Sequence, residues 1–259
     1  MTIDLNEEVG LYQRLESLYP YIKNELRIFY NFHSSKIEGN LLTLSETRVV
    51  LEDRMGVSKP IKDIISTQNH DRAVDYVINT LVPQNEKISL CNIREIQSLI
   101  EPNKAGFRKI PVEISGTNTK VGQVYEINTS LEKIIDEFYC SQDDFISRVA
   151  IFHANFETIH PFLDGNGRTG RLLMNLELMK KGFPLTSILH QDRGQYYHAL
   201  ESVQTEGDYS LLTRVIESSI IQTIAYAKTK SLFKEQDKSD YLSLERSVSY
   251  THLTLPTSD

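Results

Sequence analysis

The chain has 259 residues, of which 40% are hydrophobic and 24% are charged, and its formal net charge at pH 7 is -7. This length is sufficient for a sizeable core in one large domain or two small ones. The negative charge argues against a general nucleic-acid or anionic-membrane surface, because phosphate-rich partners select clustered Lys and Arg.

The two cysteines, Cys91 and Cys140, lie far apart and match no metal-binding spacing. We expect both to be buried, reduced thiols of a cytoplasmic protein. Acidic residues interrupt the start of the chain, so no signal peptide is expected, and no segment is apolar for long enough to span a membrane.

The N-terminal part of the chain has the pattern of successive helices. Apolar residues recur at helical spacing from Ile22 to Phe32, and the segment SSKIEGN (residues 34–40) ends in the Gly and Asn that are typical of a helix end. Thr43 and Glu46 then have capping-box spacing, which predicts the start of the next helix.

Two further helices are expected before a change of pattern. The first covers about residues 62–81, where Pro83 would stop it, and the second covers about residues 90–100, before Pro102.

Residues 106–127 have a different pattern. Ile110, Val112 and Ile114 alternate at a period of two, and glycine and asparagine residues then supply turn chemistry. This segment predicts a small β-hairpin.

Helical periodicity returns after the predicted hairpin. Thr129 and Glu132 again have capping-box spacing, and apolar residues from Phe145 to Phe156 form a stripe that runs straight into His160. The helix that carries this stripe is expected to be deeply buried.

The C-terminal part predicts three more helices. One ends at Gly182 and Pro184, one lies between Asp192 and Gly207, and a last amphipathic stretch covers about residues 210–235. The ending SYTHLTLPTSD, residues 249–259, resembles a cloning remnant and carries no argument.

Residues 160–171, HPFLDGNGRTGR, concentrate polar side chains and three glycines. Gly165, Gly167 and Gly170 match the dinucleotide fingerprint G-x-G-x-x-G, but that motif requires a preceding strand and a βαβ unit. Here a helical stripe precedes the glycines, so the dinucleotide interpretation is rejected. The Lys-Ser or Lys-Thr of a P-loop is also absent from the segment.

The local order helix, loop, helix predicts an anion-binding site. A second helix that starts near Gly167 or Arg168 would point its first N–H groups at the loop, and such groups bind phosphate. Arg168 and Arg171 are three residues apart on one helical face, so both guanidinium groups are able to reach one polyphosphate.

Two other residues of the segment complete the predicted chemistry. Asp164 lies at the mouth of the loop, where cationic surroundings keep its carboxylate ionised and suited to Mg²⁺. His160 is the group that is able to take a proton near neutral pH. Together these features predict transfer of a phosphate-bearing group to an acceptor. The plain alternative is a capped helix with a surface charge cluster.

The segment resembles the Fic signature H-P-F-x-D/E-G-N-G-R-x-x-R, with every specified position filled, and the resemblance extends from about residue 30 to about residue 225. SSKIEGN is similar to the Fic inhibitory motif S/T-x-x-x-E-G/N, which predicts an inhibitory helix on the N-terminal side of the core. The predicted hairpin resembles the Fic flap.

The resemblance implies a mainly α Fic fold, a helical bundle core with a small β-hairpin flap. Residues 1–95 would form an N-terminal helical region with the inhibitory motif, residues 96–225 the Fic core domain, and residues 226–259 a C-terminal helix end and non-native tail.

The implied reaction is the transfer of AMP from ATP, with Mg²⁺, to a Ser, Thr or Tyr hydroxyl of a target protein, and pyrophosphate is released. The chain itself is one candidate target, by auto-AMPylation. Neither nucleic acid nor a membrane is an expected partner. A homodimer is one option that the sequence leaves open.

The resemblance also implies a role for each residue of the signature. His160 would be the general base, Asp164 the Mg²⁺ ligand, Arg168 the β-phosphate ligand and Arg171 the γ-phosphate ligand. Asn166 and Gly167 would stabilise charge on the α-phosphate. Phe162 would be an apolar plug. The other implied nucleotide-binding residues are Gly165, Thr169, Gly170, Ile114, Ser115, Gly116, Thr117, Tyr196, Tyr197 and Gln204.

In the inhibitory motif, formed by Ser34, Glu38 and Gly39, the resemblance implies that Glu38 reaches Arg171 and occupies the γ-phosphate position. Three alternatives remain open at this stage. In the first, the same site acts in reverse as a hydrolase that removes AMP from a modified protein. In the second, the transferase uses a nucleotide other than ATP. In the third, the protein is a nucleotide-binding regulatory module without turnover.

Overall fold

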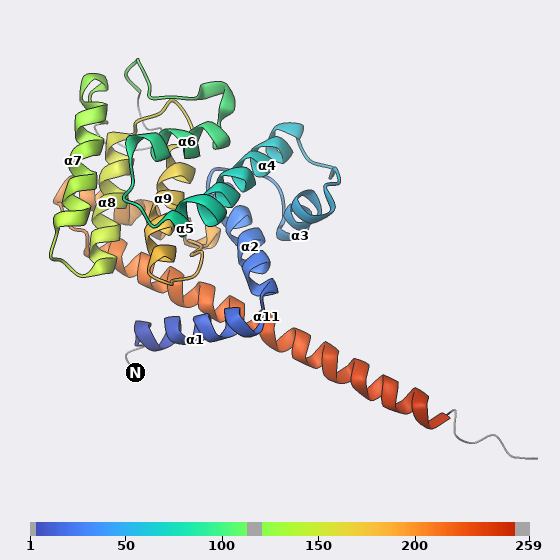
Figure 1. The fold of residues 1–259 in the computed structure, drawn as a ribbon. Helices are drawn as coiled ribbons and strands as arrows, with labels where there is room; N and C mark the ends of the chain where they lie inside the picture. The colour runs from blue at the N-terminus through green and yellow to red at the C-terminus, as the bar shows by residue number, and fades with distance from the viewer. Residues whose placement is uncertain (1–3, 113–120, 252–259) are drawn as a thin grey trace, which may run out of the picture.

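The computed structural model describes residues 4–112 and 121–251, which are arranged as helices joined by short loops (Figure 1). The N-terminal helices are α1 (Leu5–Leu18), α2 (Tyr21–Ile37), α3 (Leu44–Arg48), α4 (Ile61–Tyr76), α5 (Val82–Gln84) and α6 (Leu90–Ile100). The later helices are α7 (Ile127–Cys140), α8 (Phe145–Ile159), α9 (Asn166–Lys180), α10 (Arg193–Glu206) and α11 (Ser210–Thr251).

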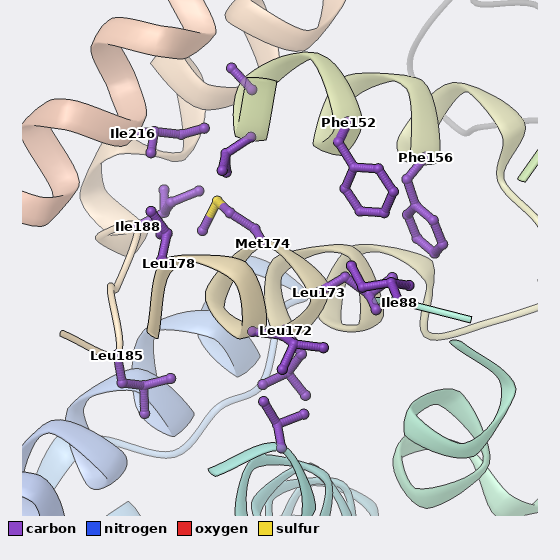
Figure 2. Close-up of a cluster of buried hydrophobic side chains, with 14 of the residues drawn as sticks. Ile88, Phe152, Phe156, Leu172, Leu173, Met174, Leu178, Leu185, Ile188 and Ile216 are labelled. Atoms are coloured by element: carbon purple, nitrogen blue, oxygen red, sulfur yellow. The ribbon is translucent and has the colours of Figure 1, made fainter. Parts of the chain in front are cut away.

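Helices α8 and α9 form the centre of the core. Helix α8 packs against α7, α9 and α11, and Phe152 and Phe156 point from it toward the apolar side chains of α9 (Figure 2). Most of α9 is buried, including Leu172, Leu173 and Met174. The expected burial is therefore confirmed for Val149, Phe152 and Phe156, whereas Phe145 at the start of α8 is partly buried. Both ends of the 160–171 segment are anchored in the core.

Helix α11 connects the core to the N-terminal helices. It packs against α1, α2, α8 and α10, and its buried residues Leu212, Ile216, Ile220 and Ile224 follow one another at a spacing of four. Its C-terminal half projects away from the other helices (Figure 1). The helix continues to Thr251, so the expected end near residue 235 was wrong.

One of the two predicted capping boxes is present. The Thr43 hydroxyl accepts a hydrogen bond from the Glu46 N–H at 3.2 Å, and the Glu46 carboxylate accepts one from the Thr43 N–H at 2.8 Å. The second predicted box was wrong, because α7 already begins at Ile127 and the Thr129 hydroxyl donates to the Glu126 carbonyl instead. Ile127 is buried, and its packing extends the helix beyond the local signal.

The expected stop at Pro83 was also wrong. After α4 the chain forms a π-helical turn, η2 (Val77–Leu81), and then the short helix α5, in which Pro83 occupies one of the first positions. Proline is tolerated in a first helical turn, where its missing N–H has no intrahelical acceptor. The helix ends two residues later at Asn85, which is in the left-handed conformation at φ 52°.

The predicted hairpin is not confirmed in the described part of the chain. Residues 106–112 and 121–127 contain no strand, and the second segment passes through a 3-10 turn, η4 (Val124–Glu126), into α7. The flap residues Ile114, Ser115, Gly116 and Thr117 lie outside the described residues.

Two other expectations were tested by the fold. Cys91 and Cys140 are free but exposed, so their expected burial was wrong. Both lie at helix ends, the first near the start of α6 and the second at the end of α7, where a side chain is able to face outward. No helix among the described residues is long and apolar enough to cross a membrane.

Candidate nucleotide and transfer site

His160 occupies a strained turn at the end of α8. Its backbone lies in the left-handed region at φ 48°, which is uncommon for a residue other than glycine, and its N–H donates to the Phe156 carbonyl at 3.0 Å. Phe162, two residues later, is fully buried and its ring contacts that of Phe107 at a centroid distance of 5.3 Å. The turn therefore holds His160 between a core helix and a buried aromatic plug.

The Asn166 side chain closes the loop that follows. Its amide nitrogen donates to the Phe162 carbonyl and its amide oxygen accepts from the Phe162 N–H, both at 2.9 Å. Gly165 precedes it at φ 80°, in the left-handed region that glycine adopts without strain. Because the side chain of Asn166 is bound within the loop, the main-chain N–H groups of the first turn of α9 are the donors that a phosphate would meet.

The glycines and Thr169 within α9 have different surroundings. A Cβ at Gly167 would lie 2.5 Å from the Glu38 carboxylate, so the absence of a side chain lets Glu38 approach α9. A Cβ at Gly170 would lie 2.9 Å from the Phe156 ring, and Thr169 is fully buried. The Cα of Gly170 and the side chain of Thr169 therefore lie where α9 packs against its neighbours.

Arg171 is buried and bound to Ser34 and Glu38 of the SSKIEGN segment. Its guanidinium lies 2.7 Å from the Glu38 carboxylate and donates to the Ser34 carbonyl at 3.0 Å and to the Ser34 hydroxyl at 3.1 Å. Burial lowers the pKa of Arg171, but the charge of Glu38 more than offsets this effect and raises the pKa well above its usual value. Gly39 follows at φ 88° and turns the chain away from α2.

Arg168 and Asp164 have partners that the sequence did not reveal. Arg168 lies 2.7 Å from the Glu101 carboxylate and donates to the Ser66 hydroxyl at 2.8 Å. The Lys104 ammonium lies 2.5 Å from the Asp164 carboxylate. Burial raises the pKa of Asp164, but the hydrogen bond from Lys104 and the other donors lower it below its usual value.

The site could not have been completed from the sequence, because Ser66, Glu101 and Lys104 lie in no motif. The available signal was Pro102, which marked the end of a helix and therefore a loop with polar residues on both sides. The loop forms the 3-10 turn η3 (Pro102–Lys104), which faces the signature from the end of α6.

The His160 imidazole is suited to accept a proton. Burial lowers its pKa below the ordinary value, so the ring is neutral at neutral pH. Its Nδ1 atom is buried and has no hydrogen-bond partner among the described residues. Because Nδ1 is buried, Nε2 is the ring nitrogen that an acceptor hydroxyl would reach, and its lone pair is the group that a general base requires.

The predicted nucleoside residues lie in different environments. Tyr196 is fully buried, its hydroxyl lies 2.7 Å from His153 Nε2, and its ring centroid lies 6.0 Å from the Arg171 guanidinium carbon. Tyr197 is 39% exposed, and Gln204 donates to the Thr158 hydroxyl at 3.0 Å. Tyr196 therefore supports Arg171 from within the core, and Tyr197 is the tyrosine that faces solvent.

A cavity of about 520 Å³ opens beside Asp164 and Arg168 of the signature. Its wall includes Glu38 from the SSKIEGN segment, Glu101 and Lys104 from the loop after α6, and Asp164 and Arg168 from the signature. Pockets of this size are typical of small-ligand sites. Charged groups from three separate segments therefore converge on one cavity at the start of α9.

The residues present fit a magnesium ion that is shared with phosphate. Asp164 already holds a cation, the Lys104 ammonium, on its carboxylate. No group of three or more His, Cys, Asp or Glu residues that would form an all-protein metal site occurs among the described residues. One carboxylate is consistent with Mg²⁺, which commonly uses one or two carboxylates together with substrate phosphates.

Comparison with known proteins identifies relatives of this chain. Residues 87–178 match the model of the Fic/DOC family. Protein adenylyltransferase Fic from Drosophila willistoni is 34% identical over 209 residues, which cover 78% of this chain and 42% of the relative. Its namesake from Nematostella vectensis is 34% identical over 234 residues, with coverages of 81% and 53%. The chain thus spans about half the length of the curated relatives it matches.

Solved structures agree with the sequence matches. A fragment of Fic-1 from C. elegans superposes with a TM-score of 0.74 at 27% identity, covering 89% of this chain and 73% of that one. A Fic domain containing signaling protein from Bacteroides thetaiotaomicron shares the fold with a TM-score of 0.76 at 20% identity, covering 86% and 95%. These matches and the filled signature show that this chain belongs to the Fic/DOC family.

Proposed function

We propose that this chain is a protein adenylyltransferase that transfers AMP from ATP to a Ser, Thr or Tyr hydroxyl of a target protein, itself included, and that Glu38 inhibits it. The observation that carries the proposal is that one short loop joins His160, at the end of α8, to Asp164, Arg168 and Arg171 at the start of α9, with Glu38 bound to Arg171. The names of the curated relatives support the same reaction class.

The chemistry follows from the surroundings of each group. Neutral His160 takes the proton of the acceptor hydroxyl, and the hydroxyl oxygen forms a bond to the α-phosphorus while the bond to the bridging oxygen breaks. The main-chain N–H groups at the start of α9 and the guanidinium of Arg168 stabilise the charge that develops on the phosphates. Pyrophosphate leaves with that charge.

Magnesium would be held by Asp164, on the carboxylate that now binds Lys104. When bound, the ion would neutralise phosphate charge and orient the leaving group. The chain's own contribution is to keep this carboxylate ionised, because Lys104 and the main chain of the loop lower its pKa.

Inhibition follows from the position of Glu38. Its carboxylate binds the guanidinium of Arg171, which would otherwise bind the terminal phosphate. The carboxylate also places a negative charge at the position that the triphosphate would take. The Glu38 side chain is 35% exposed, whereas that of Arg171 is 2% exposed, so the acid is the partner that is able to move away.

The test compares the wild type with Glu38→Gly and Glu38→Gln, using ATP labelled on the α-phosphate and Mg²⁺. Coupling between two sites is typically worth 1–3 kcal/mol, so Glu38→Gly should increase protein labelling by roughly tenfold or more. Glu38→Gln, which keeps the length but not the charge, should give an intermediate increase.

The matched control is His160→Ala in the Glu38→Gly background, which keeps the opened site but lacks the base. It should bind ATP and transfer no label. Equal labelling by the wild type and Glu38→Gly would contradict inhibition, and the absence of labelling in every Glu38 variant would contradict the transferase itself. Incubation with an AMPylated target, with release of AMP as the readout, identifies the reverse reaction.

A further inference from the structure

Arg108 is a buried basic residue to which the proposed chemistry gives no role. It lies in the irregular segment after η3 and is 3% exposed. Arginine is seldom buried to this extent unless its donors are satisfied. Here the acceptors are main-chain carbonyl oxygens from two parts of the chain.

The first set of acceptors is the turn that carries His160. The Arg108 guanidinium donates through Nε to the His160 carbonyl at 2.8 Å and through Nη2 to the Ile159 carbonyl at 3.4 Å. The Arg108 N–H donates to the Pro161 carbonyl at 2.9 Å. One residue therefore binds three consecutive carbonyls at the end of α8.

The second set lies on either side of residues 113–120. Nη1 donates to the Ile110 carbonyl at 3.2 Å, and Nη2 also donates to the Gly122 carbonyl. Gly122 in turn donates its N–H to the Thr158 carbonyl at 3.2 Å, and a Cβ on it would lie 3.3 Å from the Ile159 carbonyl oxygen. The two segments that flank residues 113–120 thus meet at the end of α8, with the guanidinium between them.

Physical chemistry explains why a cation suits this position. The last carbonyls of a helix have no intrahelical donor and form the negative end of the helix dipole. His160 stands at φ 48°, and a residue other than glycine persists in this region where surrounding contacts over-determine it. Arg108 supplies both the positive charge and the contacts.

We propose that Arg108 is a positioning residue that holds the main chain of His160 in its left-handed turn and so aims the imidazole at the acceptor. The inference rests on the proposed transfer for its kinetic consequence, but its structural consequence is independent of it. Arg108 reaches the chemistry through the main chain of His160, and none of the described contacts of its guanidinium is with the phosphate-binding groups.

The kinetic test uses Arg108→Met and Arg108→Lys in the Glu38→Gly background. A small misplacement of a reacting group costs up to about a hundredfold in rate, so Arg108→Met should lower kcat by roughly tenfold to a hundredfold while KM for ATP stays within about twofold. Arg108→Lys keeps the charge and should restore part of kcat. The matched control is Lys109→Met, which removes a neighbouring exposed charge and should leave both parameters unchanged.

A second readout does not depend on transfer. In protein labelled with ¹³C-histidine, the imidazole signal of His160, assigned by its loss in His160→Ala, should shift in both Arg108 variants and stay in place in Lys109→Met. Where Arg108→Met fails to fold, Arg108→Lys gives the same comparison.

Three results would overturn the role of Arg108. These are an unchanged kcat, a loss of ATP binding equal to the loss of rate, or an unmoved imidazole signal. Absence of transfer in the Glu38→Gly parent would instead refute the proposed function, and the imidazole signal would then decide the role of Arg108 alone.

Discussion

Each charged residue that the signature offers to a ligand already has a protein partner. Arg171 binds Glu38, Arg168 binds Glu101, and Asp164 binds Lys104. On the proposed function, a nucleotide and its cation would therefore replace ion pairs rather than fill an uncharged space. The pairs differ in burial, since the side chains of Arg171 and Arg168 are 2% and 7% exposed and that of Lys104 is 50% exposed.

The Lys104–Asp164 pair predicts how the site responds to magnesium. Lys104→Met removes the cation that competes for the Asp164 carboxylate, and exposed ion pairs are worth about 0.2–1 kcal/mol. The Mg²⁺ concentration that gives half-maximal binding of a fluorescent ATP analogue should therefore fall by about twofold to fivefold. Lys62→Met is the control, because Lys62 lines the same cavity. An equal effect of the two substitutions would mean that the cavity responds to total charge rather than to this pair.

At the scale of the helices, the site depends on how closely α9 approaches α8. Gly170 lies where a Cβ would meet the Phe156 ring and the carboxylate of Glu157, which is itself buried. Neither neighbour is at the end of a flexible, solvated side chain. The glycine therefore sets the distance between α8, which ends at His160, and α9, which carries Arg168 and Arg171.

Gly170→Ala tests this distance. In an open helix, replacement of Gly by Ala stabilises by up to about 1 kcal/mol, whereas overpacking a core costs about 1–3 kcal/mol. The melting temperature should fall in Gly170→Ala and rise slightly in the control Gly10→Ala, which has open space around its Cβ in α1. Equal melting temperatures for the two variants, measured by calorimetry, would show that α9 moves away without cost.

The helices were predictable where one local pattern decided them. The aromatic stripe lies within α8 itself, and the Thr43 capping box lies at the start of α3, so each pattern is next to the helix that it predicts. The start of α7 was not predictable in this way. Burial of Ile127 makes the helix begin two residues before Thr129, where the sequence pattern had placed the cap. The hairpin expectation used two local signals, alternation and turn residues, whereas the described ends of that segment are joined through Arg108.

At the scale of the whole molecule, the predicted signature forms one half of the site and long-range partners form the other. The residues of the signature lie within one continuous segment, so a motif was enough to find them. Glu101, Lys104 and Arg108 reach it from more than 50 positions away along the chain. They have no mutual spacing that a single sequence reveals, because the packing of α6 against α9 brings them there.

Glu157 links this site to the stability of the whole fold. It lies on α8 and is buried, and burial raises its pKa from 4.5 to about 8, with the charge of Arg171 opposing the shift. A folded state that keeps a proton that the unfolded state has lost becomes less stable as pH rises. The free energy of unfolding should therefore lose about 1.4 kcal/mol per pH unit from this group until pH passes its folded pKa.

Glu157→Gln tests this linkage, because the amide resembles the protonated acid in shape and does not ionise. Buried histidines with lowered pKa values, such as His33 and His153, act in the opposite direction at acidic pH, so the informative window is pH 6.5 to 8. Across it, the melting temperature of Glu157→Gln relative to that of the wild type should rise by roughly 3–6 °C per pH unit and then level off. Glu132→Gln, an exposed change on α7, should show a constant difference from the wild type. A constant difference for Glu157→Gln as well would mean that Glu157 is ionised in the folded protein, with Arg171 as its counter-charge.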